Sequence, residues 1–138
     1  MQPRGGKSQR GRSRGRLRHL SDARLPGADL TSANLHGADL LRADLASANL
    51  TGAKLTAVNL TRANLREADL HGADLRGAHL LLTNLSHAKL SNAILTGAIL
   101  TGADLRSAVG LSQMQLNEAC GTATRLPPGV TLDNCLGK

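Results

Sequence analysis

Leucine returns at every fifth position from Leu25 to Leu105, and this spacing dominates the 138-residue chain. Alanine stands two places before nearly all of these leucines, and Val58 and Thr83 interrupt that column. The residue directly before leucine is Asp or Asn in eleven of the units, and the two residues after it vary and are mostly polar. Each five-residue unit therefore supplies one large and one small apolar side chain to a common core.

A period of five fits neither an α-helix nor a flat β-strand. On an α-helix, five residues advance by about 500°, so the leucines would spiral around the rod instead of forming a stripe. On a strand, an odd period sends alternate leucines to opposite faces. A chain that turns after each short segment keeps every leucine inside, and four such segments, or twenty residues, close one coil. We therefore expect stacked coils whose backbone groups pair at a spacing of ~4.8 Å.

The run ADLTSANLHGADLLRADLASANL at residues 28–50 resembles the pentapeptide-repeat proteins, whose repeat is written A(D/N)LXX. The resemblance covers residues 21–110 and implies an all-β fold, a right-handed quadrilateral β-helix (β-solenoid), here of about four and a half coils. It also implies the best-known activity of the family, which is protection or inhibition of DNA gyrase by mimicry of duplex DNA. Members with that activity resemble longer, acidic rods, whereas residues 21–110 carry eight acidic and eight basic residues. Gyrase modulation is therefore the disfavoured alternative.

Charge separates the N-terminal tail from the rest of the chain. Residues 1–20 carry seven basic residues and no acidic one, which accounts for the whole net charge of +7. A stretch rich in Arg, Gly and Ser is typical of a disordered arm. Basic side chains of this kind bind nucleic-acid phosphates with release of counterions, although no aromatic residue is present to stack on bases. The candidate nucleic-acid contacts are Arg10, Arg12, Arg14, Arg16 and Arg18. A solvated tail, or an extension from a misassigned start codon, is the other interpretation.

The repeats end at residue 110, and the last part of the chain has the pattern of a cap. Ser112 and Gln115 have the spacing of a capping box, which predicts a short α-helix that runs to about Cys120 with Gly121 at the C′ position. The apolar face that would cover the last coil consists of Leu111, Met114 or Leu116, and Ala119. The expected parts are thus a basic disordered tail (1–20), the β-helix (21–110) and a helix-and-turn cap (111–138).

Some apolar residues depart from the repeat because they occupy outward positions. Leu41, Leu81 and Leu82 do so on a single face, since residues twenty apart share a face, and exposed apolar side chains can mark a contact surface. Ile94 and Ile99 also replace the usual Asp or Asn, and packing near the C-terminal cap explains them. We therefore expect a non-enzymatic module that presents a rigid rod surface to an unidentified protein partner. A weak homodimer through an exposed coil end is a further expectation.

No residue pattern indicates catalysis, a metal site or a cofactor. The histidines of the repeats stand at outward positions, with no Cys or carboxylate at the spacing of metal ligands. No Gly-rich turn joins a strand to a helix as a phosphate-binding loop does. We therefore expect no catalytic, cofactor-binding or metal-binding residues, and we classify the chain as a non-enzyme.

Cys120 and Cys135 are the only cysteines, and they flank a Pro-Pro-Gly turn that can bring them together. A disulfide that closes this loop would contribute ~3 kcal/mol to stability, and two reduced thiols are the alternative. The chain has neither the apolar stretch of a secretory signal nor the ~18 consecutive apolar residues of a membrane helix. We therefore expect a cytoplasmic protein without membrane contact, or an exported one if the true start lies upstream and the disulfide forms.

Overall fold

The structure is a computed structural model that describes residues 19–137. The candidate nucleic-acid contacts Arg10, Arg12, Arg14, Arg16 and Arg18 lie outside the described residues. His19 and Leu20, which the charge pattern placed in the tail, belong to the first coil, because His19 forms a parallel β-bridge with Asp39.

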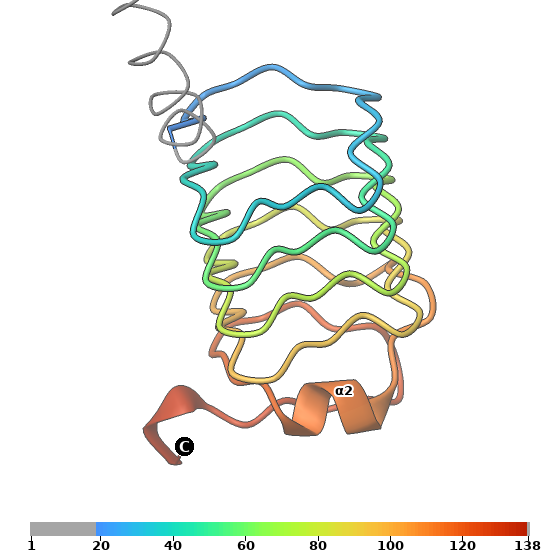
Figure 1. The fold of residues 1–138 in the computed structure, drawn as a ribbon. Helices are drawn as coiled ribbons and strands as arrows, with labels where there is room; N and C mark the ends of the chain where they lie inside the picture. The colour runs from blue at the N-terminus through green and yellow to red at the C-terminus, as the bar shows by residue number, and fades with distance from the viewer. Residues whose placement is uncertain (1–18, 138) are drawn as a thin grey trace, which may run out of the picture.

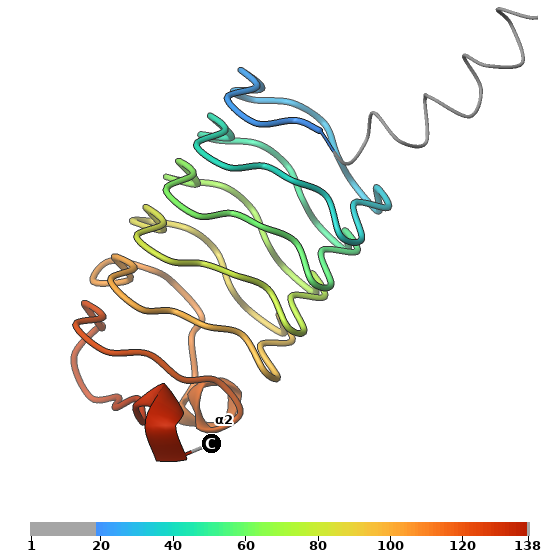
Figure 2. The same cartoon turned by 90° about the vertical axis from the view of Figure 1, so that its left-hand side faces the viewer.

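The chain winds into a stack of coils that runs from the N-terminal end to the C-terminal end (Figure 1). Parallel β-bridges join residues twenty apart, from the pair His19–Asp39 to the pair Lys89–Val109. One coil therefore contains four pentapeptides, and the expected β-solenoid with faces formed by residues twenty apart is confirmed. The pairing within residues 19–137 consists of isolated bridges, since each straight segment is short before the next turn begins. The same stack is visible from the side in Figure 2.

The core is a column of leucine and alanine along the coil axis. The central leucines from Leu35 to Leu105 are at most 4% exposed, and most are fully buried. Val58 and Thr83 fill alanine positions and are equally buried. The Thr83 hydroxyl donates a hydrogen bond to the Leu60 carbonyl at 2.8 Å, which removes most of the cost of burying a polar group.

Each turn has the same backbone geometry. The alanine N–H donates to the carbonyl of the leucine three residues earlier, as from Ala43 to Leu40 at 2.9 Å. The second residue after each leucine has a positive φ at every unit from residue 22 to residue 102, as the third residue of a type II turn does. Glycine fills seven of these positions, because it adopts a positive φ without a steric penalty.

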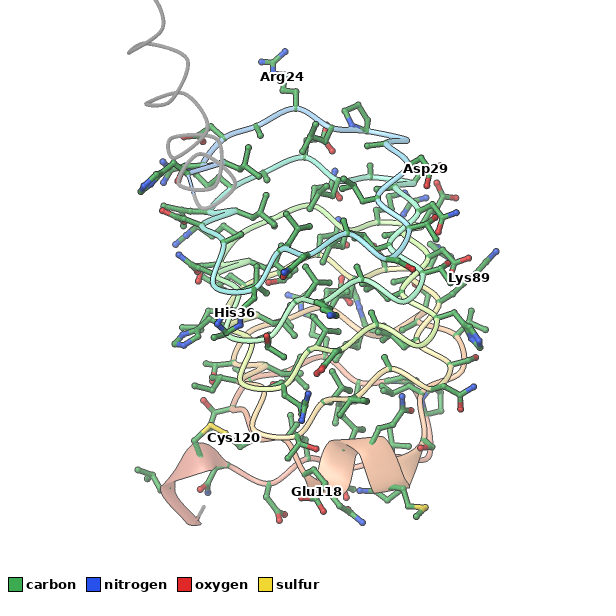
Figure 3. All side chains as sticks on the ribbon, in the orientation of Figure 1. Arg24, Asp29, His36, Lys89, Glu118 and Cys120 are labelled. Atoms are coloured by element: carbon green, nitrogen blue, oxygen red, sulfur yellow. A yellow bond between two sulfur atoms is a disulfide. The ribbon has the colours of Figure 1, made fainter. Side chains whose placement is uncertain are left out.

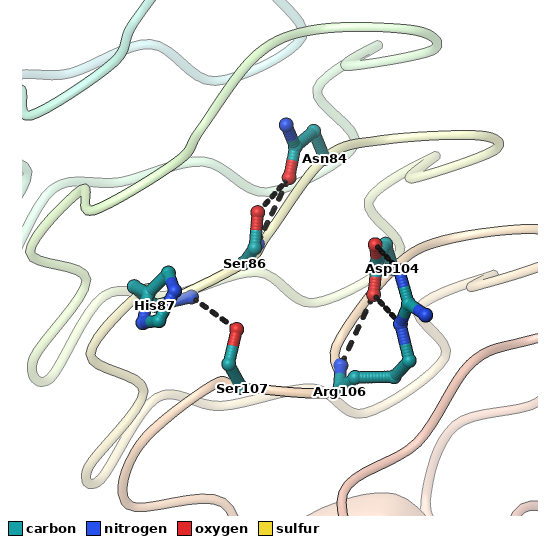
Figure 4. Close-up of polar contacts among 6 residues, drawn as sticks. All are labelled: Asn84, Ser86, His87, Asp104, Arg106 and Ser107. Carbon is teal, nitrogen blue, oxygen red and sulfur yellow. Dashed lines mark hydrogen bonds and ion pairs between the residues drawn. The ribbon is translucent and has the colours of Figure 1, made fainter.

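The Asp and Asn residues before the leucines form hydrogen bonds within their own turns. In all eleven units the side-chain Oδ1 accepts the backbone N–H two residues further along, in the manner of an Asx turn. Figure 4 shows two examples, from Ser86 N–H to Asn84 at 3.0 Å and from Arg106 N–H to Asp104 at 3.2 Å. These side chains therefore stabilise the turns that the repeat requires.

The C-terminal end of the stack is covered by the helix α2 (Gln113–Asn117). The predicted capping box is confirmed, because the Ser112 side chain accepts from Gln115 N–H while the Gln115 side chain accepts from Ser112 N–H. The prediction that the helix reaches Cys120 is wrong, since Glu118 is its C-cap. The cause is non-local: Cys120 forms a parallel bridge with Ile99, so the chain has already returned to the stack.

Two further details of the cap differ from the sequence expectation. Gly121 is not at C′ of the helix, and its N–H donates to the carbonyl of Asp133 at 2.9 Å. Leu116 and Ala119 are buried against the last coil, whereas Met114 is 81% exposed, so Leu116 is the covering side chain. The described chain ends in the 3-10 helix η1 (Cys135–Gly137). Within residues 19–137, no helix is long and apolar enough to traverse a lipid bilayer.

Candidate interaction surface

The turn after Leu80 carries Leu81 and Leu82 and is termed here the leucine corner. Leu81 is half-buried and Leu82 is 51% exposed. Leu41 occupies the same column and is half-buried, but Thr61 of the intervening coil lies between it and Leu81. Two coil spacings amount to ~10 Å, so the structure does not bring Leu41 into the leucine corner.

Leu82 is unusual in its backbone as well as its exposure. Its φ of 56° lies in the left-handed region, which costs an L-residue about 1–2 kcal/mol. The other turn residues with positive φ between residues 22 and 102 are glycine, alanine, polar or charged, so Leu82 is the one large apolar side chain among them. A strained backbone position that also exposes an apolar side chain is a candidate for function.

Charged residues occupy the same column of turns in the coils that precede Leu82. Arg42 pairs with Asp22, with Nε and Oδ1 at 2.8 Å, and this hydrogen bond lowers the pKa of the Asp22 carboxyl. Arg62 lies one coil before Leu82, and no carboxylate of residues 19–137 is within ion-pair distance of it. The same column of turns therefore carries an exposed apolar side chain at Leu82 and, one coil earlier, a guanidinium group at Arg62 that pairs with no carboxylate of residues 19–137.

A second apolar feature is a shallow groove of about 230 Å³ between the last coil and α2. Ile94 and Met114 line it, and Ile94 is 43% exposed. Ile99 is half-buried and bridges to Cys120, so packing near the cap accounts for Ile99 but leaves Ile94 accessible.

The two cysteines lie together at the covered end of the stack. Cys120 and Cys135 form a disulfide with a Cα–Cα distance of 4.9 Å, and Cys120 is 8% exposed. Figure 3 shows Cys120 and Glu118 near this end and Arg24 at the opposite end. The disulfide connects η1 to the coil that carries Ile99, because Cys120 bridges to Ile99. Neither cysteine belongs to the leucine corner.

The polar side chains of the coil surface contact one another and the turns. His36 Nδ1 contacts the Thr56 hydroxyl one coil away, and the His87 N–H donates to the Ser107 hydroxyl at 3.1 Å (Figure 4). In residues 19–137 no three His, Cys, Asp or Glu side chains are grouped so that they could hold a metal ion.

Comparison with known proteins finds the same sequence repeat and the same fold. The sequence matches the family of pentapeptide repeats in eight copies, over residues 19–45, 43–80 and 83–120. The solved structure of the pentapeptide repeat protein Rfr23 from the cyanobacterium Cyanothece 51142 is 39% identical over 76% of this chain, with a TM-score of 0.55. This chain spans 64% of the length of that protein. A pentapeptide repeat protein from Nostoc Pcc 7120 is 35% identical, with a TM-score of 0.61 and coverage of 77% of this chain and 82% of its own.

A more distant structure shares the fold alone. A trypsin-treated form of QnrB1, a plasmid-mediated fluoroquinolone resistance protein, is 20% identical with a TM-score of 0.65, and the match covers 80% of this chain and 55% of that one. No curated protein matches the sequence at a significant level.

Proposed function

Since the chain belongs to the pentapeptide repeat family, we propose that it is a non-enzymatic interaction module whose coil presents the leucine corner to a protein partner. In this proposal the coil is a right-handed, four-sided β-helix of about four and a half coils over residues 21–110. The coil serves as a rigid support, because its leucine and alanine column is packed along the whole length of the described repeats.

The observation that carries the proposal is the combination of strain and exposure at Leu82. Asn or Gly at this turn would relieve the left-handed strain, and a polar residue would remove the exposed apolar surface. The fold therefore gains nothing from leucine here beyond its contact with the next coil. An exposed apolar side chain in the same column of turns as the unpaired guanidinium of Arg62 fits a partner surface that pairs an apolar pocket with a carboxylate.

The proposal that the chain is not an enzyme rests on how its polar side chains are used. The eleven Asp and Asn residues accept backbone hydrogen bonds in their own turns. They are therefore tied to structural positions and are not free to converge on a substrate.

A crosslinking capture from source cells tests the leucine corner. Leu82→Asn keeps a residue that tolerates a positive φ and removes the apolar surface. His87→Asn is the matched control, because His87 occupies the equivalent position in the next turn with a φ of 59°. We expect a partner that both the native protein and the His87 variant capture to be lost with the Leu82 variant. Equal capture by all three proteins would exclude the leucine corner.

Association of the tail with nucleic acid is a second candidate, and the excess of basic over acidic residues in residues 1–20 favours it. A gel-shift titration would compare the full chain with a chain that lacks residues 1–18, which contain all seven basic side chains and leave His19 and Leu20 in the first coil. Loss of binding on deletion, with an affinity that falls steeply as salt rises, is the expected result. Gyrase modulation is the weaker candidate, because residues 21–110 carry equal numbers of acidic and basic side chains.

A further inference from the structure

The N-terminal end of the stack has unpaired backbone groups. In later coils, the residue before each leucine directs both its N–H and its carbonyl at the preceding coil. Asp44 N–H donates to Ala23 at 2.8 Å, and the Asp44 carbonyl accepts from Leu25 at 2.7 Å. The equivalent groups of the first coil, at Arg24, Asp29 and Asn34, have no partner among residues 19–137.

The apolar interior is also open at this end. Leu20, Leu25 and Leu30 are half-buried, whereas the central leucines from Leu40 to Leu80 are 0% exposed. An uncovered edge of this kind is a template for pairing with another chain. The eighteen residues before His19 contain only two large apolar side chains, Met1 and Leu17, so their composition is poorly suited to covering it.

We propose that a second copy of this chain covers the open end, and that the two first coils pair edge to edge about a two-fold axis. The edge rises like a ramp from His19 to Asn34, by about a quarter of the ~4.8 Å coil spacing at each pentapeptide. A two-fold axis perpendicular to the coil axis, passing between residues 26 and 27 at the midpoint of this rise, keeps the distance between the two edges equal on all four sides. With the axis at any other position, the two edges would be closer on one side than on another.

This register also matches the side chains. It sets Arg24 of each copy opposite Asp29 of the other, as an antiparallel pair that exchanges two backbone hydrogen bonds. Inside, Leu25 faces Ala28 of the second copy and Leu30 faces its Ala23, so large side chains meet small ones. A two-fold axis through Arg24 or through Asp29 would instead set like charges opposite each other. Figure 3 shows Arg24 and Asp29 near this end of the stack.

The assembly is closed. α2 covers the opposite end of the stack, so each chain has one open end and the pairing stops at two copies instead of continuing as a fibre. The inference is independent of the proposed function, because the leucine corner is outside the first coil and stays exposed in the dimer.

Sedimentation equilibrium of the full chain tests the pairing and its charges. The mass is expected to rise with concentration from 14.4 kDa toward twice that value. Arg24→Asp alone, or Asp29→Arg alone, should raise the dissociation constant at least about tenfold, and the double exchange should restore it. Arg66→Asp, a charge change at an exposed site away from the first coil and from the leucine corner, should leave it unchanged. A full chain that stays monomeric at millimolar concentration overturns the proposal.

Cysteine crosslinking tests the register itself. Opposed residues of a hydrogen-bonded antiparallel pair have Cα atoms about 5.5 Å apart, which suits a disulfide. A mixture of Arg24→Cys chains and Asp29→Cys chains should form a covalent heterodimer on oxidation, while either variant alone should not. Crosslinking of Arg24→Cys with itself, as efficient as in the mixture, would overturn the register and with it the proposed axis.

Discussion

The side chain of Leu82 lies over Gly102, one coil further along the same column of turns. A Cβ placed on Gly102 would be 2.6 Å from Leu82 Cδ2, closer than real Cβ contacts come. Both residues have a positive φ, 56° at Leu82 and 72° at Gly102. The absence of a side chain at residue 102 is therefore what allows the leucine to fold back on the coil surface.

Gly102→Ala should destabilise the protein by about 1–2 kcal/mol from left-handed strain, and by a little more because the flexible end of Leu82, which is 51% exposed, must rotate away from the added Cβ. Gly72→Ala is the matched control, because φ is +66° there and nothing lies within 4 Å of the added Cβ. That control should lose only the strain contribution of about 1–2 kcal/mol. Chemical denaturation followed by circular dichroism measures both. Equal losses in the two variants would show that the Leu82 contact is of no consequence.

Lys89→Asn should stabilise the fold by about 0.5–1 kcal/mol, because it supplies the Oδ1 acceptor that this unit lacks. The Ser91 N–H has no acceptor among residues 19–137, whereas the equivalent His71 N–H donates to Asp69 at 3.0 Å. Asp69→Ala should destabilise by a similar amount, and Asp69→Asn should not. Denaturation midpoints of the three variants give the comparison, and a destabilising Lys89→Asn would contradict the Asx interpretation.

The stability should fall in acid through Asp104. The hydrogen bond from the Arg106 side chain, together with that from the Arg106 N–H, holds the pKa of the Asp104 carboxyl below its ordinary value. A pKa that is lower in the folded than in the unfolded state stabilises the fold above about pH 4, and this contribution disappears as the pH falls through the lower value.

Asp104→Asn keeps an Oδ1 acceptor for the Arg106 N–H and removes the titration. We expect it to cost at most about 1 kcal/mol at pH 7 and less at pH 3, because the ion pair is partly exposed. Denaturation curves at pH 7, 5, 4 and 3 measure the difference. A constant difference between native and variant over that range would contradict the assignment.

Loss of the disulfide should loosen the cap and leave the coils intact. Cys135→Ser is expected to lower the free energy of unfolding by up to about 3 kcal/mol, since the bond closes a loop with a sequence separation of 15. Hydrogen exchange should quicken in residues 121–137 and not in the bridged coils.

A thiol titration in denaturant gives the redox state directly. No thiol should react before reduction of the native protein and two should react afterwards. Two reactive thiols before reduction would contradict the disulfide.

The coil could be predicted from the sequence because its determinants are local and repeated. Leucine recurs every five residues with an alanine two places earlier, and both are buried only if the chain turns after each unit and coils around its own axis. The bridges between residues twenty apart follow from this coil. Two signals were present without being interpreted. The Asp and Asn before leucine indicated the side-chain hydrogen bonds of the turns, and glycine at the second place after leucine indicated the positive φ.

The end of α2 and the contacts of Leu82 could not be predicted in this way. Glu118 ends the helix because Cys120 pairs with Ile99, and that pairing depends on a distant part of the chain. The packing of Leu82 depends on Gly102, twenty residues away, and it becomes visible only when the coils are stacked.

Because one coil contains twenty residues, the side of the rod on which a residue lies depends on its position within the coil. A deletion of one full coil would shorten the rod and return every surface residue to its own column, so neighbours such as Lys89 and Val109 would keep their alignment. Insertion of a single pentapeptide between Leu82 and Gly102 would instead turn everything beyond it by a quarter. The core would accept both changes equally, because each unit offers the same leucine and alanine. Changes in length can therefore rearrange the outer surface of this protein while its interior stays the same.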